Sequence, residues 1–337
     1  MKGLTNGQRY CKVCGTKLQK NGIECGKQRW RCPDCKTARV LPRQDVSSRN
    51  SEQTHQHYLL GKQTAKEVAK SAGISLSTLA RRRNTTRYGK DSFYRRPTIT
   101  GEVYPYIAID ATGLNVEIVA IVRDKLYTRN WRFAPYESSL VWTETLSELP
   151  RPGGIICDGQ KGILKAVSTL WGDDMVIQRC HFHVKQNMRA KLTNHPESAA
   201  GIDLKRLINC LPATKNELQM AIFIGIFYAL YDVYENFLNE KTYSHHILNS
   251  FGSLTKRRWF YTHRRVRSAY RQISNLIEQD QLFAYITHPE LGLPATNNLL
   301  EGGLNARLSE LLRVHRGMPP ERQRQLVSEY LFSRSEH

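Results

Sequence analysis

The sequence has no apolar run long enough to cross a lipid bilayer. Its longest run, residues 220–231, is well short of the roughly 20 residues that a transmembrane helix needs, and it predicts a buried core helix instead. The first ten residues also lack the apolar centre of a signal peptide. These two absences argue against a membrane or exported protein and predict a cytoplasmic one.

Acidic side chains are scarce relative to basic ones. The 337 residues include 30 Asp and Glu against 50 Lys and Arg, for a formal net charge of +20. This excess favours a polyanionic partner such as nucleic acid. Many proteins with basic surfaces never act on DNA, so charge alone does not identify the partner. The length allows two or three domains with a sizeable core.

Cysteine is also sparse, and in a chain without a signal peptide it argues for metal ligation, not a disulfide framework. Two CxxC pairs are separated by 17 residues, a spacing typical of structural zinc sites. Four thiolates on two tight turns supply the tetrahedral shell that zinc prefers. The pattern predicts a zinc ribbon over residues 1–45, with Cys25 left out. Its ligands are Cys11, Cys14, Cys32 and Cys35.

Residues 64–83 predict two short helices separated by Gly73, with Ser75 capping the second. A helix-turn-helix places its second helix in the major groove of DNA, and the arginine run and the neighbouring ribbon favour this interpretation. The alternative is a plain helical hairpin with a solvated basic end. With a linker at 87–97, this domain spans residues 46–97. Its candidate DNA contacts are Ser75, Ser77, Thr78, Arg81, Arg82 and Arg83.

Two aspartates are expected at strand ends. Residues 104–110 predict a strand that ends in Asp110, and residues 115–122 a second strand that buries Val116 on its inner face. A third strand is expected near residues 126–133. Residues 155–157 predict a buried strand that delivers Asp158, followed by a helix and another strand. Strand, helix, strand requires a parallel sheet, whose strand ends commonly bind ligands. Either aspartate alone is more simply a turn residue.

The third acidic candidate is Glu301. On the helix expected over residues 295–317, Asn297, Glu301 and Asn305 are spaced by four and share one face. Gly302 and Gly303 each weaken a helix by about 1 kcal/mol relative to alanine, which suggests a close backbone approach. A solvated glutamate is the plain alternative, and Glu290 and Glu310 are the substitute candidates.

Cys180 and His183 resemble half of a zinc site where a helix begins. No second pair has matching spacing, so a structural role beside the two strand-end aspartates is the preferred interpretation.

Strand signals stop between residues 191 and 294, which predicts an all-helical insertion. Its polar end interleaves aromatic and basic side chains over residues 256–271, a pattern that can hold phosphates and stack an unpaired base. The alternative places the aromatic residues in the core, beneath arginines that extend to solvent. The candidate DNA contacts are Trp259, Arg264, Arg265 and Arg267, with Arg313 and Arg316 beyond the insertion.

Taken together, these motifs resemble a bacterial transposase of the Mutator-like insertion-sequence superfamily. The resemblance covers about residues 107–317. It is carried by the strand ending in Asp110, by Asp158-Gly159, by Gln178-Arg179-Cys180-x2-His183 with Asn187, by residues 259–267, and by Thr296-Asn297-Asn298 with Glu301.

The resemblance implies an α/β fold: a ribonuclease H-like mixed sheet core, interrupted by an all-helical insertion and preceded by the zinc ribbon and helix-turn-helix. The core would comprise residues 98–190 and 295–337, with the insertion at 191–294. A DDE triad of Asp110, Asp158 and Glu301 would hold two Mg²⁺ or Mn²⁺ ions. The implied enzyme is a DNA transposase that binds double-stranded transposon ends and target DNA, cleaves and transfers strands, pairs two ends as a homodimer, and associates with the bacterial nucleoid.

Two other functions are compatible with parts of the pattern. A non-catalytic DNA-binding regulator, derived from a transposase, would keep the ribbon and the helix-turn-helix. A structure-specific nuclease could use the same three acids but would leave the two front modules unexplained.

Overall fold

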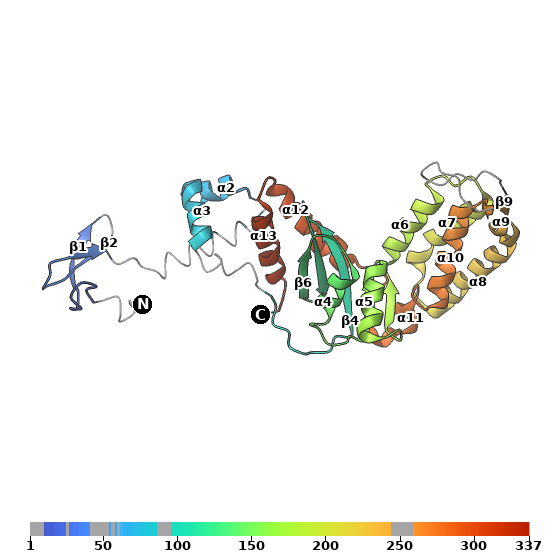
Figure 1. Ribbon diagram of the computed structural model, residues 1–337, viewed down its shortest axis with the longest axis horizontal. Helices are drawn as coiled ribbons and strands as arrows, with labels where there is room; N and C mark the ends of the chain where they lie inside the picture. The colour runs from blue at the N-terminus through green and yellow to red at the C-terminus, as the bar shows by residue number, and fades with distance from the viewer. Residues whose placement is uncertain are drawn as a thin grey trace. The chain divides into compact units, whose positions relative to one another are not determined.

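The computed structural model describes residues 10–24, 27–40, 54, 58, 61, 63–85, 96–243 and 259–336. The chain divides into two compact units, Met1–Phe93 and Tyr94–His337. Each unit is described by itself (Figure 1).

A small antiparallel sheet of three strands lies near the N-terminus, in the order β1-β2-β3. Its core is limited to Cys11, Leu18 and Cys32, with Trp30 packed against them. So few apolar side chains cannot offset the entropy of ordering the segment, which implies a further source of stability. The strands are β1 (Gln19–Glu24), β2 (Lys27–Arg31) and β3 (Ala38–Val40).

Two short helices, α2 (Ala65–Ser71) and α3 (Leu76–Thr85), form the next element, as predicted. The first begins with a capping box between Thr64 and Glu67. Gly73 follows with φ +63°, a left-handed conformation that ends a helix at little cost. Ser75 Oγ then accepts the Thr78 amide at 3.1 Å, which caps the second helix.

A mixed five-stranded sheet forms the centre of the second unit, in the order β6-β5-β4-β7-β8. The first three strands are antiparallel to one another, whereas β7 lies parallel to β4 and β8 parallel to β7. The mixed α/β class is therefore confirmed. The strands are β4 (Tyr106–Gly113), β5 (Ile118–Arg123), β6 (Thr128–Ala134), β7 (Gly154–Cys157) and β8 (Val176–Arg179).

Two predicted strand boundaries were wrong. The first strand does not end at Asp110 but continues to Gly113, paired along its length with β5. The second strand begins only at Ile118, because the Leu114 amide donates to the Glu117 carbonyl at 2.7 Å and closes a turn there. Val116 therefore lies in the turn, 63% exposed.

Helices cover both faces of this sheet. On one face, α4 (Ser139–Leu146) and α5 (Lys161–Trp171) complete an apolar core with alternate residues of the strands, such as Ile107 and Ile109. The C-terminal elements η5 and α13 contact the sheet at β4 and β6, respectively. Their bounds are η5 (Leu299–Asn305, a π-helix), α12 (Ala306–Val314) and α13 (Pro320–Phe332).

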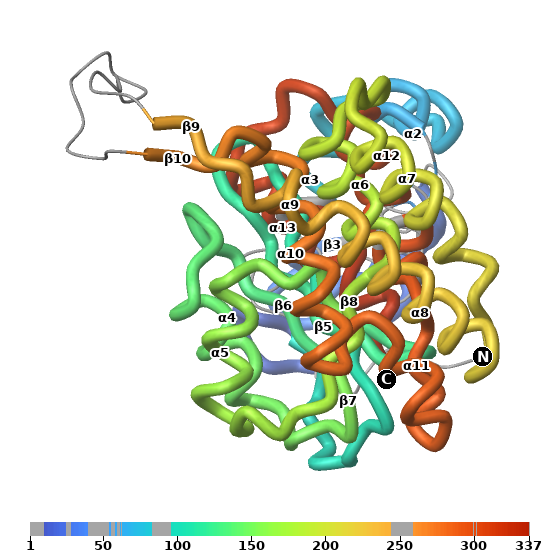
Figure 2. The backbone as a smooth tube through the Cα atoms, turned by 90° about the vertical axis from the view of Figure 1, so that its right-hand side faces the viewer, coloured from blue at the N-terminus to red at the C-terminus, as the bar shows by residue number. Residues whose placement is uncertain are grey.

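A helical bundle, defined here as α6 to α11, separates β8 from η5 along the chain (Figures 1 and 2). Its core joins Val184 and Met188 of α6 to Phe227 of α8 and Tyr270 of α10. The elements are α6 (His181–Leu192), α7 (Ala199–Asn209), η3 (Leu211–Ala213), α8 (Glu217–Val233), α9 (Glu235–Asn239), α10 (Arg264–Glu278), α11 (Ala284–Thr287) and η4 (Pro289–Leu291).

The predicted insertion needs three corrections. It is not all-helical, because β9 (Lys241–Tyr243) and β10 (Trp259–Tyr261) form an antiparallel ribbon. Its packing begins at α6, ten residues before the predicted boundary at 191, because α6 contributes to the core of the bundle. Finally, α8 is not wholly buried: Phe223 and Phe227 face the core, whereas Ile222 and Ile226 are exposed.

Among the described residues, none of the helices combines the length and the apolar character that spanning a membrane requires.

Candidate functional site

Four cysteines converge at the N-terminal sheet, as their spacing predicted. The ligand atoms of Cys11, Cys14, Cys32 and Cys35 all lie within 4.8 Å of one another. The Sγ atoms of Cys11 and Cys35 are 3.4 Å apart, and those of Cys14 and Cys32 are 3.3 Å apart. This cysteine cluster can hold a metal ion such as zinc, and its small sheet is compatible with a zinc ribbon.

The local surroundings prepare part of the cluster for metal binding. Hydrogen bonding with Thr16 lowers the pKa of the Cys14 thiol to about 6, and hydrogen bonding with Thr37 lowers the pKa of Cys35. Burial instead raises the pKa of Cys32 to about 11. Since metals bind the thiolate form, the two exposed cysteines are the first to be available as ligands.

The pairing of β4 with β7 joins the two strands that lead to Asp110 and Asp158. The two strands are parallel, and Ala108 and Ile156 are their last paired residues. Asp110 follows Ala108 by two residues within β4, and Asp158 follows Ile156 by two residues, directly after the end of β7. Both aspartates therefore come just after the paired segment, on the side of the carboxyl end of β7.

The backbone after Asp158 is held in one shape. The Asp158 carboxylate accepts the Gln160 amide at 2.8 Å, and the Arg179 guanidinium donates to the Asp158 carbonyl oxygen at 2.8 and 3.2 Å. Gly159 has φ +78°, and a Cβ there would lie 1.7 Å from the Arg179 guanidinium carbon. The positive φ and this close approach both favour glycine, so Gly159 and Arg179 together hold the backbone turn that follows Asp158.

Asparagine side chains connect the C-terminal segment to the Asp110 strand. Asn305 Nδ2 donates to the Asp110 carboxylate at 2.7 Å, and buried Asn297 donates through Nδ2 to the Ile109 carbonyl at 3.2 Å. The Asn297 amide also donates to Cys180 Sγ at 3.2 Å. Within the described residues, the Oδ1 atoms of both asparagines are buried and have no hydrogen-bond partner. Two buried acceptors are therefore left over, one of them on the side chain that bonds to the Asp110 carboxylate, which is unusual in a folded protein.

Glu301 lies on η5, where the backbone forms a π-helix instead of the expected α-helix. Its side chain is outside the described residues. π-turns occur frequently at functional sites. The glycine prediction holds for Gly302 alone: a Cβ there would lie 2.2 Å from Asn298 Oδ1, whereas at Gly303 the nearest atom is 3.8 Å away.

Of the other acidic candidates, Glu290 forms a surface ion pair with His288 at 3.4 Å. Glu310 lies on α12, one turn beyond the π-helix.

Cys180 and His183 flank the start of α6, as expected. Cys180 is fully buried at the N-cap of this helix, and its sulfur accepts the Asn297 amide. Within the described residues, the only potential metal cluster of three or more ligands is the N-terminal one. Cys180 therefore connects α6 to the asparagine segment.

Glu137 is a further acid at this site that the sequence patterns did not single out. It follows β6 by three residues, and its carboxylate accepts the Trp142 indole N–H at 2.8 Å. Burial raises the pKa of Glu137, an effect that the Trp142 bond opposes and the nearby charge of Asp158 reinforces. An acid just beyond a strand is the same signal that marked Asp158, so this residue could have been found.

The raised pKa of Glu137 makes a testable prediction about stability. Folding raises the pKa of this carboxyl group above its value in the unfolded chain, which is about 4.3. The folded state therefore loses stability as the pH rises from that unfolded pKa through the folded pKa. Glu137→Gln keeps an acceptor for Trp142 but removes this penalty. We expect the Tm of the variant to exceed that of the wild type by a margin that grows between pH 4 and pH 8. The margin should be about 2–4 °C for each kcal/mol of unfolding free energy that the substitution restores. A pH-independent gain, measured by calorimetry, would contradict the assignment.

Three of the residues proposed to contact DNA lie at the N-terminal end of α3. Ser75 and Ser77 are exposed and Thr78 is half-buried, and the Ser75 hydroxyl group hydrogen-bonds to each of the other two at 2.9 Å. Arg81 is also exposed and Arg82 half-buried, whereas the side chain of Arg83 lies outside the described residues.

The basic segment after Trp259 has two roles in the structure. Arg265 donates to the Ala190 carbonyl at 2.5 Å, and Arg267 donates to the Leu238 carbonyl while its guanidinium lies 3.8 Å from the Tyr261 ring centroid. Arg265 therefore joins α10 to α6, and Arg267 joins α10 to α9 and to the β9–β10 ribbon.

Trp259 and several arginines are available to a ligand. Trp259 is 39% exposed, with the Lys241 ammonium 4.4 Å from its ring centroid. Arg264, Arg313 and Arg316 are exposed at helix ends.

The comparison with known protein families found no family model that matches the chain, and the search of curated proteins found no matching relative.

Proposed function

We propose that the protein is a DNA transposase of the DDE type, which cleaves the ends of a mobile element and joins them to target DNA. The observation that carries the proposal is the parallel pairing of β4, which contains Asp110, with β7, which Asp158 directly follows. The chain also combines these carboxylates with a net charge of +20 and a cysteine cluster that can hold zinc.

The topology of the second unit supports a ribonuclease H-like core. The first strand of the sheet is central, two antiparallel strands lie on one side of it, and two parallel strands reached by helices lie on the other. The helical bundle then enters between β8 and the η5 helix, where the resemblance to Mutator-like transposases expects an insertion.

The residues at the site suit divalent cations such as Mg²⁺ or Mn²⁺. Carboxylates are the ligands that these hard ions prefer, and the unsatisfied Oδ1 atoms of Asn297 and Asn305 mark a place where further polar partners are needed. Asp110, Asp158 and Glu301 would hold the ions. When bound, such ions activate a water or a DNA 3′-hydroxyl and stabilise the leaving oxygen.

The neighbouring residues would position this centre. Asn305 fixes one oxygen of Asp110, and Arg179 with Gly159 fixes the turn that presents Asp158. Glu137 adds a negative charge near Asp158, and bound cations would offset the repulsion between the two carboxylates. We therefore propose that Glu137 adds to the negative potential that attracts the cations.

The front modules would bring double-stranded DNA to the site. Helix α3 presents hydroxyl and guanidinium groups of the kind that contact bases and phosphates. The cysteine cluster would hold structural zinc. Pairing two ends requires two active sites, so we expect a homodimer on DNA.

Cleavage of a labelled duplex that carries the element's own terminus, in Mg²⁺ or Mn²⁺, tests the proposal. Metal-dependent cutting followed by joining to target DNA is expected. Cutting without joining would point to a structure-specific nuclease. Binding of paired ends without any cutting would favour the alternative function, a DNA-binding regulator that has lost transposase activity.

A further inference from the structure

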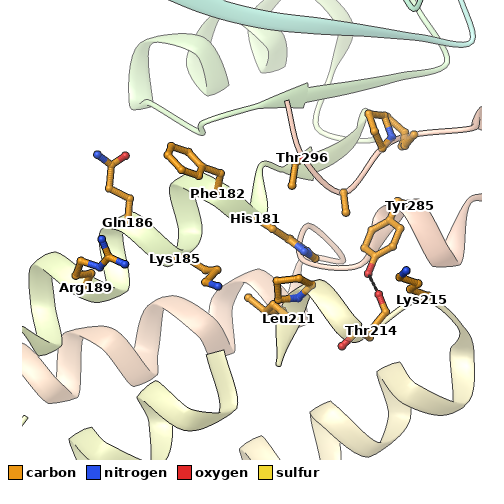
Figure 3. A pocket seen from close by; sticks show the side chains of 14 residues that line it. His181, Phe182, Lys185, Gln186, Arg189, Leu211, Thr214, Lys215, Tyr285 and Thr296 are labelled. Atoms are coloured by element: carbon orange, nitrogen blue, oxygen red, sulfur yellow. Dashed lines mark hydrogen bonds between the residues drawn. The ribbon is translucent and has the colours of Figure 1, made fainter. Parts of the chain in front are cut away.

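A cavity of about 690 Å³ opens between α6, the residues around η3, and the segment that precedes η5 (Figure 3). Its lining includes His181 and Phe182 of the Gln178-to-His183 motif and Thr296 of the Thr296-Asn297-Asn298 motif. Its size is within the range of pockets that bind small molecules or single nucleotides.

The charged side chains that line the cavity are all basic. Lys185 and Arg189 line it from α6, Lys215 lines it from the other wall, and no Asp or Glu is among its lining residues. Burial lowers the pKa of the lining His181, so this ring is neutral near pH 7. Three cations without a nearby acid favour an anionic ligand.

The rest of the lining is apolar and aromatic. Phe182 is 56% exposed although it is a large apolar side chain. Tyr285 is anchored by its hydroxyl, which donates to the Thr214 carbonyl at 2.5 Å, and His181 bonds to the Leu282 carbonyl at 2.7 Å. Fixed rings beside cations can bind a nucleotide, because a base stacks on the rings while the phosphate pairs with the cations.

The cavity is lined by segments that also hold the carboxylate strands. Its wall includes Thr296, whose neighbour Asn297 bonds to the Asp110 strand. Its other wall, α6, follows Arg179, which holds the Asp158 turn. We propose that this cavity holds an unpaired nucleotide of the DNA strand whose phosphate lies at Asp110 and Asp158. The proposal rests on the proposed function, since it assigns a subsite to the same substrate.

Photocross-linking tests this assignment. The full chain, loaded with zinc, is irradiated with a single-stranded oligothymidine that carries one 5-iodouracil, and the linked peptides are mapped by mass spectrometry. We expect linkage to Phe182 or Tyr285. Lys185→Ala with Lys215→Ala should lower the yield at these peptides at least about fivefold, whereas Lys125→Ala with Lys165→Ala, an equal loss of charge on other surfaces, should not.

The outcomes separate the two proposals. Linkage confined to other segments, or linkage to Phe182 that both double variants leave unchanged, overturns the nucleotide subsite even if the enzyme cuts DNA. Linkage at the cavity that responds to the lysine variants supports the subsite even if no cutting occurs, and in that case only the transposase function fails.

A second inference arises from α8, which lies at the edge of the helical bundle (Figure 2). One face of this helix packs on the core through Phe223 and Phe227. The opposite face is a stripe of exposed apolar residues, called here the α8 stripe. Its large members are 46–73% exposed, and its small members lie between them. The stripe consists of Leu218, Ala221, Ile222, Gly225, Ile226, Ala229 and Val233.

We propose that the α8 stripe is the contact with a second copy of this chain. If a large side chain has a surface of about 200 Å², the exposed fractions of the four large residues of the stripe add up to roughly 500 Å² of apolar surface on each copy. A two-fold pair doubles this to about 1,000 Å², the threshold for a specific interface, before the small residues are included. Gly225 is at the middle of the helix with nothing within 4 Å of its Cβ position, so two backbones can approach closely there.

Charge complementarity favours an antiparallel crossing of two α8 helices. A crossing at Gly225 sets residue 218 of one copy opposite residue 232 of the other, and residue 215 opposite residue 235. Asp232 then lies near the N-terminal end of the partner helix, whose dipole favours an anion, and Lys215 lies near Glu235.

Light scattering after size-exclusion chromatography tests this interface without DNA. We expect twice the chain mass for the wild type and the mass of one chain for the double variant Ile222→Glu with Ile226→Glu. The dimer dissociation constant of the double variant should be at least about 100-fold higher than that of the wild type. Leu140→Glu, which also charges an exposed apolar residue, should remain dimeric. Circular dichroism checks folding. A monomeric wild type, which would leave the stripe to a different partner, or a dimer that survives the double variant, overturns the assignment.

Discussion

Asp158→Asn is expected to lower the rates of metal-dependent cleavage and strand transfer by about 1,000-fold or more, while DNA binding is retained. The charge stabilisation supplied by bound cations is worth several kcal/mol, and each 1.36 kcal/mol changes a rate tenfold. Asparagine keeps an oxygen acceptor for the Gln160 amide, so the turn before α5 should persist. Only the charge that attracts the cations is removed. The measurement is cleavage of labelled end DNA in Mg²⁺ and Mn²⁺.

A matched control is Asp174→Asn. Asp174 pairs with Arg151 at 2.6 Å, and both side chains are largely exposed, so solvent screens the ion pair and it contributes little to stability. This variant should cut DNA at the wild-type rate. Asp110→Asn should behave like Asp158→Asn, because the proposed centre uses both carboxylates to hold the cations. Retained cleavage by either active-site variant would refute the catalytic assignment.

Removal of zinc is expected to unfold the N-terminal sheet. Its described apolar core consists of Cys11, Leu18 and Cys32 with Trp30, too few side chains to offset the entropy of ordering. Zinc binding to comparable sites contributes about 10–16 kcal/mol at neutral pH. After chelation, amide protons of β1 to β3 should exchange at the rates of an unfolded chain, whereas those of β4 and β7 should keep their protection. Hydrogen exchange with mass spectrometry measures both sets.

Cysteine variants supply the control for this prediction. Cys32→Ser removes a ligand of the cluster and should lose the zinc, measured as metal bound per chain. Cys210→Ser removes an exposed cysteine outside the cluster and should retain one zinc per chain. Full zinc occupancy in Cys32→Ser, or protected amides in β1 to β3 after chelation, would show that the sheet is stable without metal.

Local patterns predicted the elements that depend on neighbouring residues. The CxxC spacing predicted the cysteine cluster because each pair needs only a tight turn, and Gly15 has the required φ of +75°. Ser75 and Gly73 predicted the boundary between α2 and α3 because caps and turns are local hydrogen-bond and backbone effects. The buried run before Asp158 likewise predicted β7.

The errors lie where long-range contacts decided the outcome. Val116 alternates with apolar neighbours, yet Glu117 is the buried residue there because Arg324 from α13 pairs with it at 2.6 Å. The ribbon of β9 and β10 pairs segments that are distant in sequence, and such pairing leaves little signal in a short window. The exposed face of α8 also had no sequence signal, because its two faces are almost equally apolar.

The sequence by itself determined the cysteine cluster, the two-helix segment, the basic charge and the identity of the acids, since each depends on residue type and short spacing. The tertiary structure alone decided that the strand of Asp110 pairs in parallel with the strand that leads to Asp158, because strand register is set by pairing across the sheet. It also decided that Asn305 holds Asp110 from a segment almost 200 residues away, and that Glu137 joins the same centre. Contacts of this range depend on how the layers pack, which no local pattern encodes.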